Sequence, residues 1–183
     1  MRRAAALLAA PLLIAAASPT PVPPRDERGR ADADCRAVEN GPAVRVAIDG
    51  LKDRQGLLVV ELYPANDDDF LASDKLLIAS GKPFRRVSAP PPPAGSARLC
   101  IRAPGAGRYA LFVLHDRDGD RKFGVLRDGA GFANNPRLGR SKPRAEAAAI
   151  LLGPAEVPAI RIVMNYRRGL GFGPLEIARE ARR

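Results

Sequence analysis

The sequence predicts an all-β protein, an antiparallel β-sandwich of about seven strands with a short helical insertion. Short segments in which apolar and polar residues alternate recur along the chain, a pattern typical of strands with one buried face. The 17 glycines and 18 prolines among 183 residues favour frequent turns. The sequence has no long amphipathic helical pattern, which argues against Rossmann and TIM-barrel architectures.

The first two strands are expected at residues 44–49 and 57–63. In both segments every second side chain is apolar and is expected to face the core, namely Val44, Val46, Ile48, Leu58, Val60 and Leu62. Asn66 is then a candidate N-cap for a short helix, with residues 67–69 in its first turn, where the helix dipole favours anions. Phe70 is expected to pack this insertion against the domain.

Five further strands are expected, at residues 84–87, 97–102, 108–116, 147–152 and 157–164. The segment 108–116 is apolar on both faces, which marks it as the central strand. Tyr109 follows Gly107 at the start of this strand. That spacing fits a tyrosine corner and fits a simple core tyrosine equally well.

The N-terminal residues are expected to direct export. Arg2 and Arg3 precede an apolar run that ends at Ala17, the pattern of a cleaved secretory signal peptide. The alternative is a membrane anchor, but a helix of about 21 Å falls short of the roughly 30 Å hydrocarbon core. The Pro-rich segment that follows is typical of an extended linker.

The sequence therefore predicts a periplasmic or secreted protein with no transmembrane anchor in the mature chain. We expect four parts: a signal peptide at 1–17, a linker at 18–34, a β-sandwich domain at 35–168 and a basic C-terminal tail at 169–183.

The two cysteines, Cys35 and Cys100, are expected to form a disulfide because an exported chain meets an oxidising compartment. With Leu99 facing the core, Cys100 shares the opposite strand face with Arg98 and Arg102. The bridge would then fasten the N-terminal segment across the outside of a sheet. The alternative is a pair of free thiols.

The amino-acid composition limits which metals and macromolecules are candidate partners. One histidine and two cysteines cannot supply a structural Cys/His zinc site or a three-histidine catalytic one. The formal charge of +10, with cations concentrated at 137–144, 166–168 and 179–183, makes anionic cell-envelope components candidate partners. An export signal and an aromatic content of 5% argue against nucleic acid, which single-strand binding proteins hold by stacking on aromatic rings.

Three carboxylates follow the central strand at alternate positions, Asp116, Asp118 and Asp120. This spacing is typical of calcium loops, in which the oxygens converge on one hard cation. An EF-hand loop has glycine at its sixth position and glutamate at its twelfth, where this chain has Arg121 and Arg127. The alternative is a turn held by salt bridges. We therefore expect no cofactor, with calcium as the candidate if one binds.

His115, the only histidine, ends the central strand beside Asp116. An imidazole oriented by a carboxylate can act as a general acid or base, or respond to acidity. A hydrolase using His115 with Asp116 therefore stays open as a hypothesis, although no serine or cysteine nucleophile lies nearby in the sequence. The alternative is a strand-end histidine that satisfies the backbone of the turn.

Residues 129–142 are expected to form a long loop, and long loops inside compact domains often carry function. Asn134 and Asn135 are candidate contacts for a polar ligand such as a glycan, with Phe132 as a packing surface. The alternative is that both asparagines close a turn through backbone hydrogen bonds while Phe132 plugs the edge of the core. With His115 and Asp116, these residues complete the candidate ligand-binding set.

Two motifs are informative together: GRYALFVLHDRDGD at 107–120 and GFANNP at 131–136. They resemble the G-x-Y-A strand, the H-D turn rich in Asp, Asn and Gly, and the later G-F-x-N-N loop of an exported bacterial family catalogued as domain of unknown function 2141. The resemblance spans about 44–165 and implies a transthyretin-like or immunoglobulin-like sandwich with no established activity. Other members place glycine where this chain has Arg121, which weakens the metal interpretation.

The leading functional hypothesis is an exported, non-enzymatic β-sandwich for binding or interaction in the cell envelope, because no catalytic constellation is evident in the sequence. A calcium-stabilised structural sandwich is the alternative, followed by the hydrolase.

Overall fold

The structure is a computed structural model, and it describes residues 32–139 and 141–175. The predicted signal peptide at 1–17 and most of the predicted linker lie outside the described residues, as do the last eight residues of the predicted tail. Among the described residues, no helix has the length and apolarity needed to cross a membrane.

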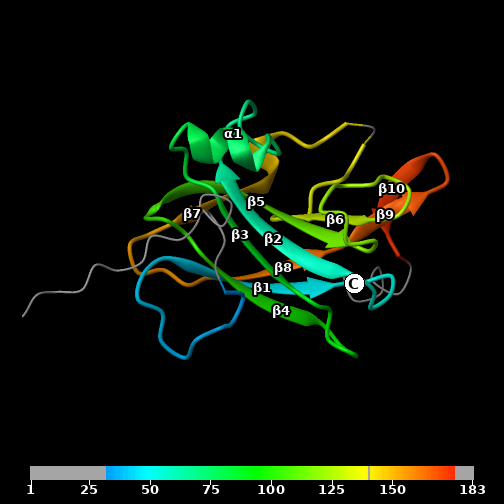
Figure 1. The fold of residues 1–183 in the computed structure, drawn as a ribbon, viewed down its shortest axis with the longest axis horizontal. Helices are drawn as coiled ribbons and strands as arrows, with labels where there is room; N and C mark the ends of the chain where they lie inside the picture. The colour runs from blue at the N-terminus through cyan, green and yellow to red at the C-terminus, as the bar shows by residue number, and fades with distance from the viewer. Residues whose placement is uncertain (1–31, 140, 176–183) are drawn as a thin grey trace, which may run out of the picture.

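Two β-sheets face each other, which confirms the predicted sandwich (Figure 1). The smaller sheet has the order β4 (Ala97–Arg102), β1 (Ala43–Asp49) and β8 (Ala159–Val163). The larger sheet has the order β10 (Gly171–Pro174), β9 (Asn165–Arg168), β6 (Gly129–Phe132), β5 (Gly107–Asp116), β2 (Leu57–Pro64) and β3 (Arg85–Ala89), and β7 (Ala149–Leu152) also pairs with β5.

The seven predicted strands are all present, but one pairing departs from the predicted antiparallel arrangement. β1 and β8 run parallel, with Arg45 opposite Ala159. The chain leaves the larger sheet after β7 and crosses to the smaller one, where Arg45 N–H donates to the Pro158 carbonyl at 2.9 Å. The crossover thus brings β8 in along the same direction as β1.

The sandwich core lies between the sheets and follows the predicted alternation. β1, β2 and β5 direct every second side chain into it, namely Val44, Val46, Ile48, Leu58, Val60, Leu62, Tyr109, Leu111 and Val113. The Tyr109 hydroxyl donates a 2.9 Å hydrogen bond to the Gly105 carbonyl. This contact is that of a tyrosine corner, the first of the two interpretations of Tyr109.

A second apolar layer covers the other face of β5. Ala110, Phe112 and Leu114 point away from the sandwich core and pack under the insertion that follows β2 and under the segment before β7. Figure 1 shows α1 (Asp74–Ala79) lying above the larger sheet, on the side away from β1, β4 and β8. The central strand is therefore buried on both faces, as its sequence predicts.

The helical insertion exists but starts later than predicted. α1 begins at Asp74, and Asn66 is not its N-cap. Asn66 instead heads a turn, in which its side-chain oxygen accepts from Asp69 N–H at 3.0 Å and its carbonyl accepts from Phe70 N–H. Leu71, at φ 63°, then reverses the backbone into the left-handed region, so this turn cannot continue as a helix.

Three strands were not expected. β6 occupies the start of the predicted loop at 129–142, and β9 and β10 form a hairpin that reaches into the predicted tail. β6 is rich in glycine because neighbours fill the space beside it. A Cβ atom on Gly129 would lie 2.5 Å from the Tyr166 ring, and one on Gly131 would lie 2.5 Å from Ile162.

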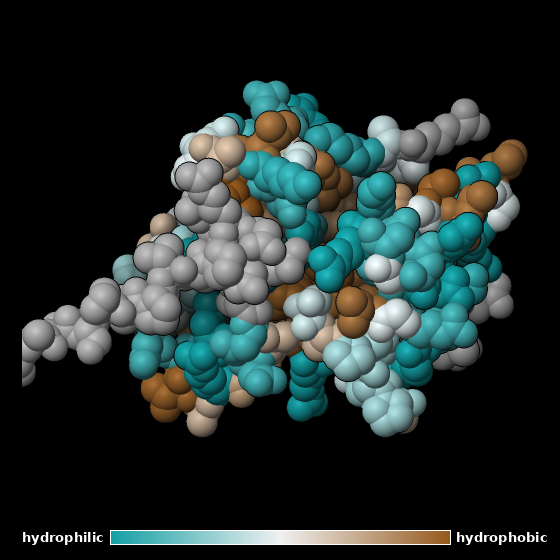
Figure 2. Space-filling model, in the orientation of Figure 1, coloured by the Kyte–Doolittle hydropathy of each residue, from teal (hydrophilic) through white to brown (hydrophobic). Residues whose placement is uncertain are grey.

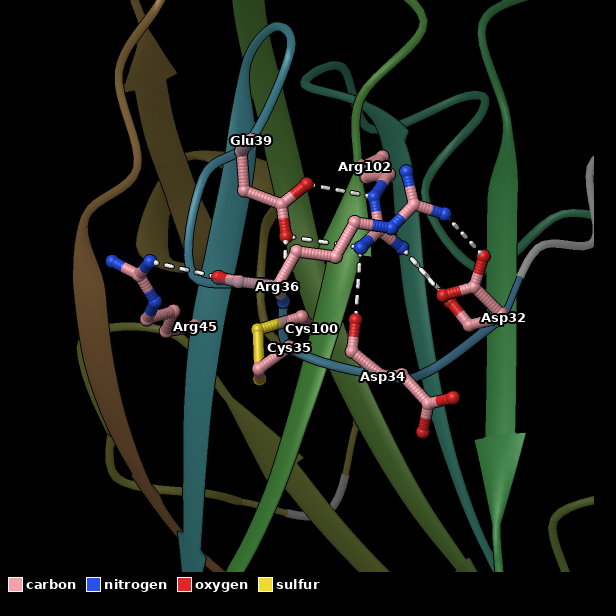
Figure 3. Close-up of a disulfide and its surroundings, with 8 residues drawn as sticks. All are labelled: Asp32, Asp34, Cys35, Arg36, Glu39, Arg45, Cys100 and Arg102. Carbon is pink, nitrogen blue, oxygen red and sulfur yellow. Dashed lines mark hydrogen bonds and ion pairs between the residues drawn. A yellow bond between two sulfur atoms is a disulfide. The ribbon is translucent and has the colours of Figure 1, made fainter.

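A disulfide joins Cys35 to Cys100, as the sequence predicts (Figure 3). The N-terminal segment crosses the outside of β4, where the Cys100 N–H donates to the Ala33 carbonyl at 2.9 Å. Beside the bridge, Arg102 pairs with Glu39 and Asp32, each at 2.8 Å (Figure 3). These contacts bury Cys100 completely and tie the segment to the smaller sheet.

Candidate functional site

The acidic turn after β5 brings the three predicted carboxylates together. One oxygen from each of Asp116, Asp118 and Asp120 lies within 4.8 Å of the other two. Asp116 is buried, and its oxygens accept from the backbone N–H groups of Gly119 at 2.9 Å and Arg121 at 3.0 Å. The convergence fits a hard cation, and the backbone bonds already order the turn without one.

The pKa values of two carboxylates in this turn are shifted in opposite directions. Burial raises the pKa of Asp116, and its two backbone hydrogen bonds only partly offset that effect. Asp118 pairs with Arg127 at 2.7 Å, and this hydrogen bond lowers the pKa of Asp118 despite a small opposing effect of desolvation. Arg127 thus supplies, from within the chain, part of the positive charge that a metal would provide.

Asp128 closes the far end of the same loop, a role that the sequence did not reveal. Its buried carboxylate accepts from Arg117 N–H at 2.9 Å and from Gly124 N–H at 2.7 Å. Nothing in its sequence neighbourhood distinguishes it from a surface aspartate. The segment from the end of β5 to the start of β6 is therefore held at both ends by buried carboxylates, Asp116 and Asp128.

His115 is completely buried, and both of its ring nitrogens are in use. Nδ1 lies 2.6 Å from the Tyr166 hydroxyl, and Nε2 lies 2.9 Å from the Gln55 carbonyl. The Gln55 carbonyl can only accept, so Nε2–H donates to it, and in the neutral imidazole Nδ1 accepts from the Tyr166 hydroxyl. The Tyr166 oxygen also accepts from Lys52 N–H at 3.0 Å. The ring thus joins three separate segments of the chain.

The surroundings of His115 favour the structural interpretation over the catalytic one. Burial lowers the pKa of His115, and the Gln55 carbonyl and the nearby Asp53 carboxylate only partly oppose this effect. Asp53 itself pairs with Arg117, whose Nε lies 2.8 Å from Asp53 Oδ2. Asp116 directs its oxygens at the backbone of its own turn and does not orient the imidazole.

Asn134 and Asn135 use their side chains to hold backbone. Asn134 Nδ2 donates to the Ala149 carbonyl at 3.0 Å, and Asn135 accepts from Val163 N–H at 2.7 Å. Both asparagines have positive φ, 61° and 46°, a conformation that this residue type tolerates. His115 and the two asparagines therefore do not share a binding site in the described part of the chain.

Phe132, by contrast, lines a cavity of about 590 Å³ on the outer face of the larger sheet. We call this cavity the outer pocket. Its floor is formed by side chains from β2, β5 and β6, and its walls by the segments 71–74, 121–125, 138–139 and 141–143 and by Phe172. Figure 2 shows brown, hydrophobic atoms set back behind teal, hydrophilic ones on the side that carries α1.

The outer pocket has a polar cluster at one end of its floor that the sequence analysis missed. Arg86 lies 2.5 Å from both Glu61 and Asp74, and Tyr63 donates to the other oxygen of Glu61 at 2.6 Å. Burial raises the pKa of Asp74, but the Arg86 guanidinium outweighs it and holds that pKa below its usual value. A glutamate inside the otherwise apolar run LLVVELY was the available signal.

Three further cations line the pocket, Arg121, Lys122 and Lys142. Lys142 Nζ donates to the Phe70 carbonyl at 2.6 Å, and this bond anchors the part of the pocket wall to which Lys142 belongs. Asp67 anchors the same wall, since it accepts from Ala145 N–H at 2.7 Å. A smaller hollow of about 160 Å³ adjoins the outer pocket and shares Glu61, Arg86, Leu114 and Arg121 with it.

This geometry suits the binding of a small molecule. Cavities that hold small ligands occupy roughly 300–1,000 Å³ and combine apolar walls with a few fixed polar groups. The outer pocket has both properties. Among the sequence-predicted site residues, only Phe132 lines it.

No curated protein and no solved structure matches this chain. Residues 46–159 do match a protein family, described as uncharacterized protein conserved in bacteria and catalogued as domain of unknown function 2141. The match covers more than half of the chain and includes β5, the acidic turn and most of the pocket floor. The chain therefore belongs to this family, as its strand and turn motifs predict.

Proposed function

We propose that this protein is an exported, non-enzymatic binding module of the cell envelope and that its ligand occupies the outer pocket. The distribution of phenylalanine carries the proposal. The sandwich core contains none of the six phenylalanines, and all six lie in the outer layer, namely Phe70, Phe84, Phe112, Phe123, Phe132 and Phe172. Four of them line a cavity that is open to solvent.

Backbone strain at the pocket supports this assignment. Leu71 and Arg121 both have φ of 63°, a conformation that costs a residue with a bulky side chain free energy. Both line the outer pocket. Strained residues persist where surrounding structure over-determines them and are concentrated at ligand sites.

Binding is tested with Nile red, a neutral apolar dye whose fluorescence rises in apolar surroundings. We expect saturable binding of one dye per chain. Ala72→Trp fills the pocket from its wall and should abolish the signal, whereas Ala159→Trp, at an exposed position on β8 of the opposite sheet, should bind as the wild type does. Equal binding by the two variants would contradict the proposal.

The export part of the proposal rests on the sequence signal at 1–17. When the protein is expressed with its native N-terminus in a Gram-negative host, we expect to find it in the periplasmic or extracellular fraction. We expect the recovered chain to begin with the residue after Ala17. Recovery of the full-length chain from the cytoplasm would overturn this part and leave the binding part untouched. Anionic envelope components and glycans are the ligands that the sequence favours.

One observation favours a second candidate role, a calcium-stabilised turn: the carboxylates of Asp116, Asp118 and Asp120 converge. The hydrolase hypothesis ranks below both, since neither nitrogen of His115 is available to a substrate. If hydrolytic activity is found, it should survive His115→Gln.

A further inference from the structure

We infer that the ligand of the outer pocket is an amphiphile with an apolar body and one anionic head group, and that Arg121 and Lys122 hold the head group. This inference rests on the proposed binding function and adds the chemical class of the ligand. The juxtaposition that supports it is an aromatic cavity with two cations in its lining whose side chains form no ion pair or hydrogen bond with the described residues.

The charged residues of the pocket fall into three groups. Glu61, Asp74 and Arg86 form an ion-paired cluster at one end of the floor, in which two carboxylates share one guanidinium. Lys142 donates to the backbone carbonyls of Asp67 and Phe70. Arg121 and Lys122 are exposed, and their side chains form no hydrogen bond or ion pair with any residue in 32–139 or 141–175. An anion placed between them would gain charge-assisted hydrogen bonds and displace no existing partner.

The acidic turn fixes the backbone of these two cations. Asp116 accepts from Arg121 N–H at 3.0 Å, and Asp120 accepts from Lys122 N–H at 2.7 Å. The turn therefore holds two adjacent basic residues in the lining of an apolar cavity. A fixed backbone lowers the entropy lost when the side chains close on an anion.

The remainder of the lining requires an apolar ligand body. Phe112, Phe132 and Leu114 form the floor, and Phe123 packs edge-on against Phe172 with 5.8 Å between ring centroids. Every buried side-chain polar atom among the described residues already has a hydrogen-bond partner. A polar body would thus lose its hydration without finding new partners.

Calorimetric titration with three ligands of equal chain length tests the inference: dodecanoate, dodecyl phosphate and dodecanol, each below its micellar concentration. We expect at least one of the two anions to bind about tenfold or more tightly than the alcohol. The tighter anion identifies the head group as carboxylate or phosphate.

The variant Arg121→Gln/Lys122→Gln should lose this preference for an anion and keep its affinity for dodecanol. Arg98→Gln is the matched control, because it removes an exposed cation from β4 on the opposite sheet. It should bind all three ligands as the wild type does. Both cations are exposed, so circular dichroism should report an unchanged fold.

The outcomes separate the inference from the proposed function. Equal binding of the alcohol and both anions, or an anion preference that survives in the double variant, overturns the inference and leaves the binding module in place. Binding of Nile red without binding of any dodecyl ligand also overturns it. If neither Nile red nor any dodecyl ligand binds, the proposed function fails with it.

Discussion

The hydroxyl of Tyr166 lies 2.6 Å from Nδ1 of His115, and the two rings meet edge to face with 6.0 Å between their centroids. The same hydroxyl accepts from Lys52 N–H. Through this pair, β9 is joined to the end of β5 and to the loop between β1 and β2. The only histidine of the chain is therefore part of a buried junction.

Removing the hydroxyl should weaken this junction. In Tyr166→Phe, the buried Nδ1 of His115 and the Lys52 N–H both lose a partner, and we expect a loss of about 1–3 kcal/mol in the free energy of unfolding. Urea denaturation measures it. The control Tyr109→Phe removes one hydroxyl bond, to Gly105, and should cost less. A larger loss in Tyr109→Phe would contradict the assignment.

The same junction predicts how stability depends on pH. Burial lowers the pKa of His115 in the folded state, so the unfolded chain, with an ordinary pKa of 6.5, binds the proton first. Stability is therefore complete above pH 6.5 and falls as the pH drops below it, by at most about 1.4 kcal/mol per pH unit. Denaturation between pH 7.5 and about 5.5 measures the slope.

His115→Gln should flatten this slope, since the chain has no other histidine to titrate in that range. Carboxylates with a lowered pKa, such as Asp118, contribute stability that is lost at lower pH. An unchanged slope in His115→Gln would show that another group is responsible.

The disulfide should stabilise the domain chiefly by restricting the unfolded chain. Its cysteines are 65 positions apart, and closing a loop of that size contributes about 4 kcal/mol in the chain-entropy description. We expect a loss of that order in Cys35→Ser/Cys100→Ser by urea denaturation. A thiol assay on the denatured wild type should find no free thiol. Two free thiols per chain would show that the disulfide does not form.

The acidic turn is expected to be stable without metal. Asp116 is already bonded to backbone N–H groups and Asp118 to Arg127, so thermal unfolding midpoints with calcium and with chelator should coincide. A midpoint that rises with calcium concentration would show a site used only in the folded state. Asp118→Asn should then abolish the rise.

Alternation of apolar residues was sufficient to predict most of the sandwich. β5 is the exception that was also predictable: Leu111 and Phe112 lie on opposite apolar faces, and both faces are buried, one under the smaller sheet and one under the insertion. The disulfide was also predicted from the sequence. Its place outside β4 was predicted because adjacent residues of a strand, here Leu99 and Cys100, point to opposite faces of the sheet.

The remaining elements depend on contacts that no local pattern contains. The glycines of β6 resemble those of a loop until Tyr166 and Ile162 are seen to occupy the space beside them. The helix starts later than predicted because Leu71 adopts a positive φ, which the local residue pattern does not reveal. The outer pocket was missed because its lining comes from segments far apart in the sequence, and of the predicted site residues only Phe132 belongs to it.

The parallel pairing of β1 with β8 has a consequence for the order in which the strands can pair during folding. Arg45 and Ala159 are neighbours in the smaller sheet, so one of the two partners of the first strand is synthesised late in the chain. Contacts between residues so distant in sequence slow folding, because the chain must lose the entropy of closing a long loop before the strand pairing can stabilise it. A chain emerging from the ribosome cannot complete its smaller sheet until residues 159–163 have followed, and until then β1 has only β4 as a partner.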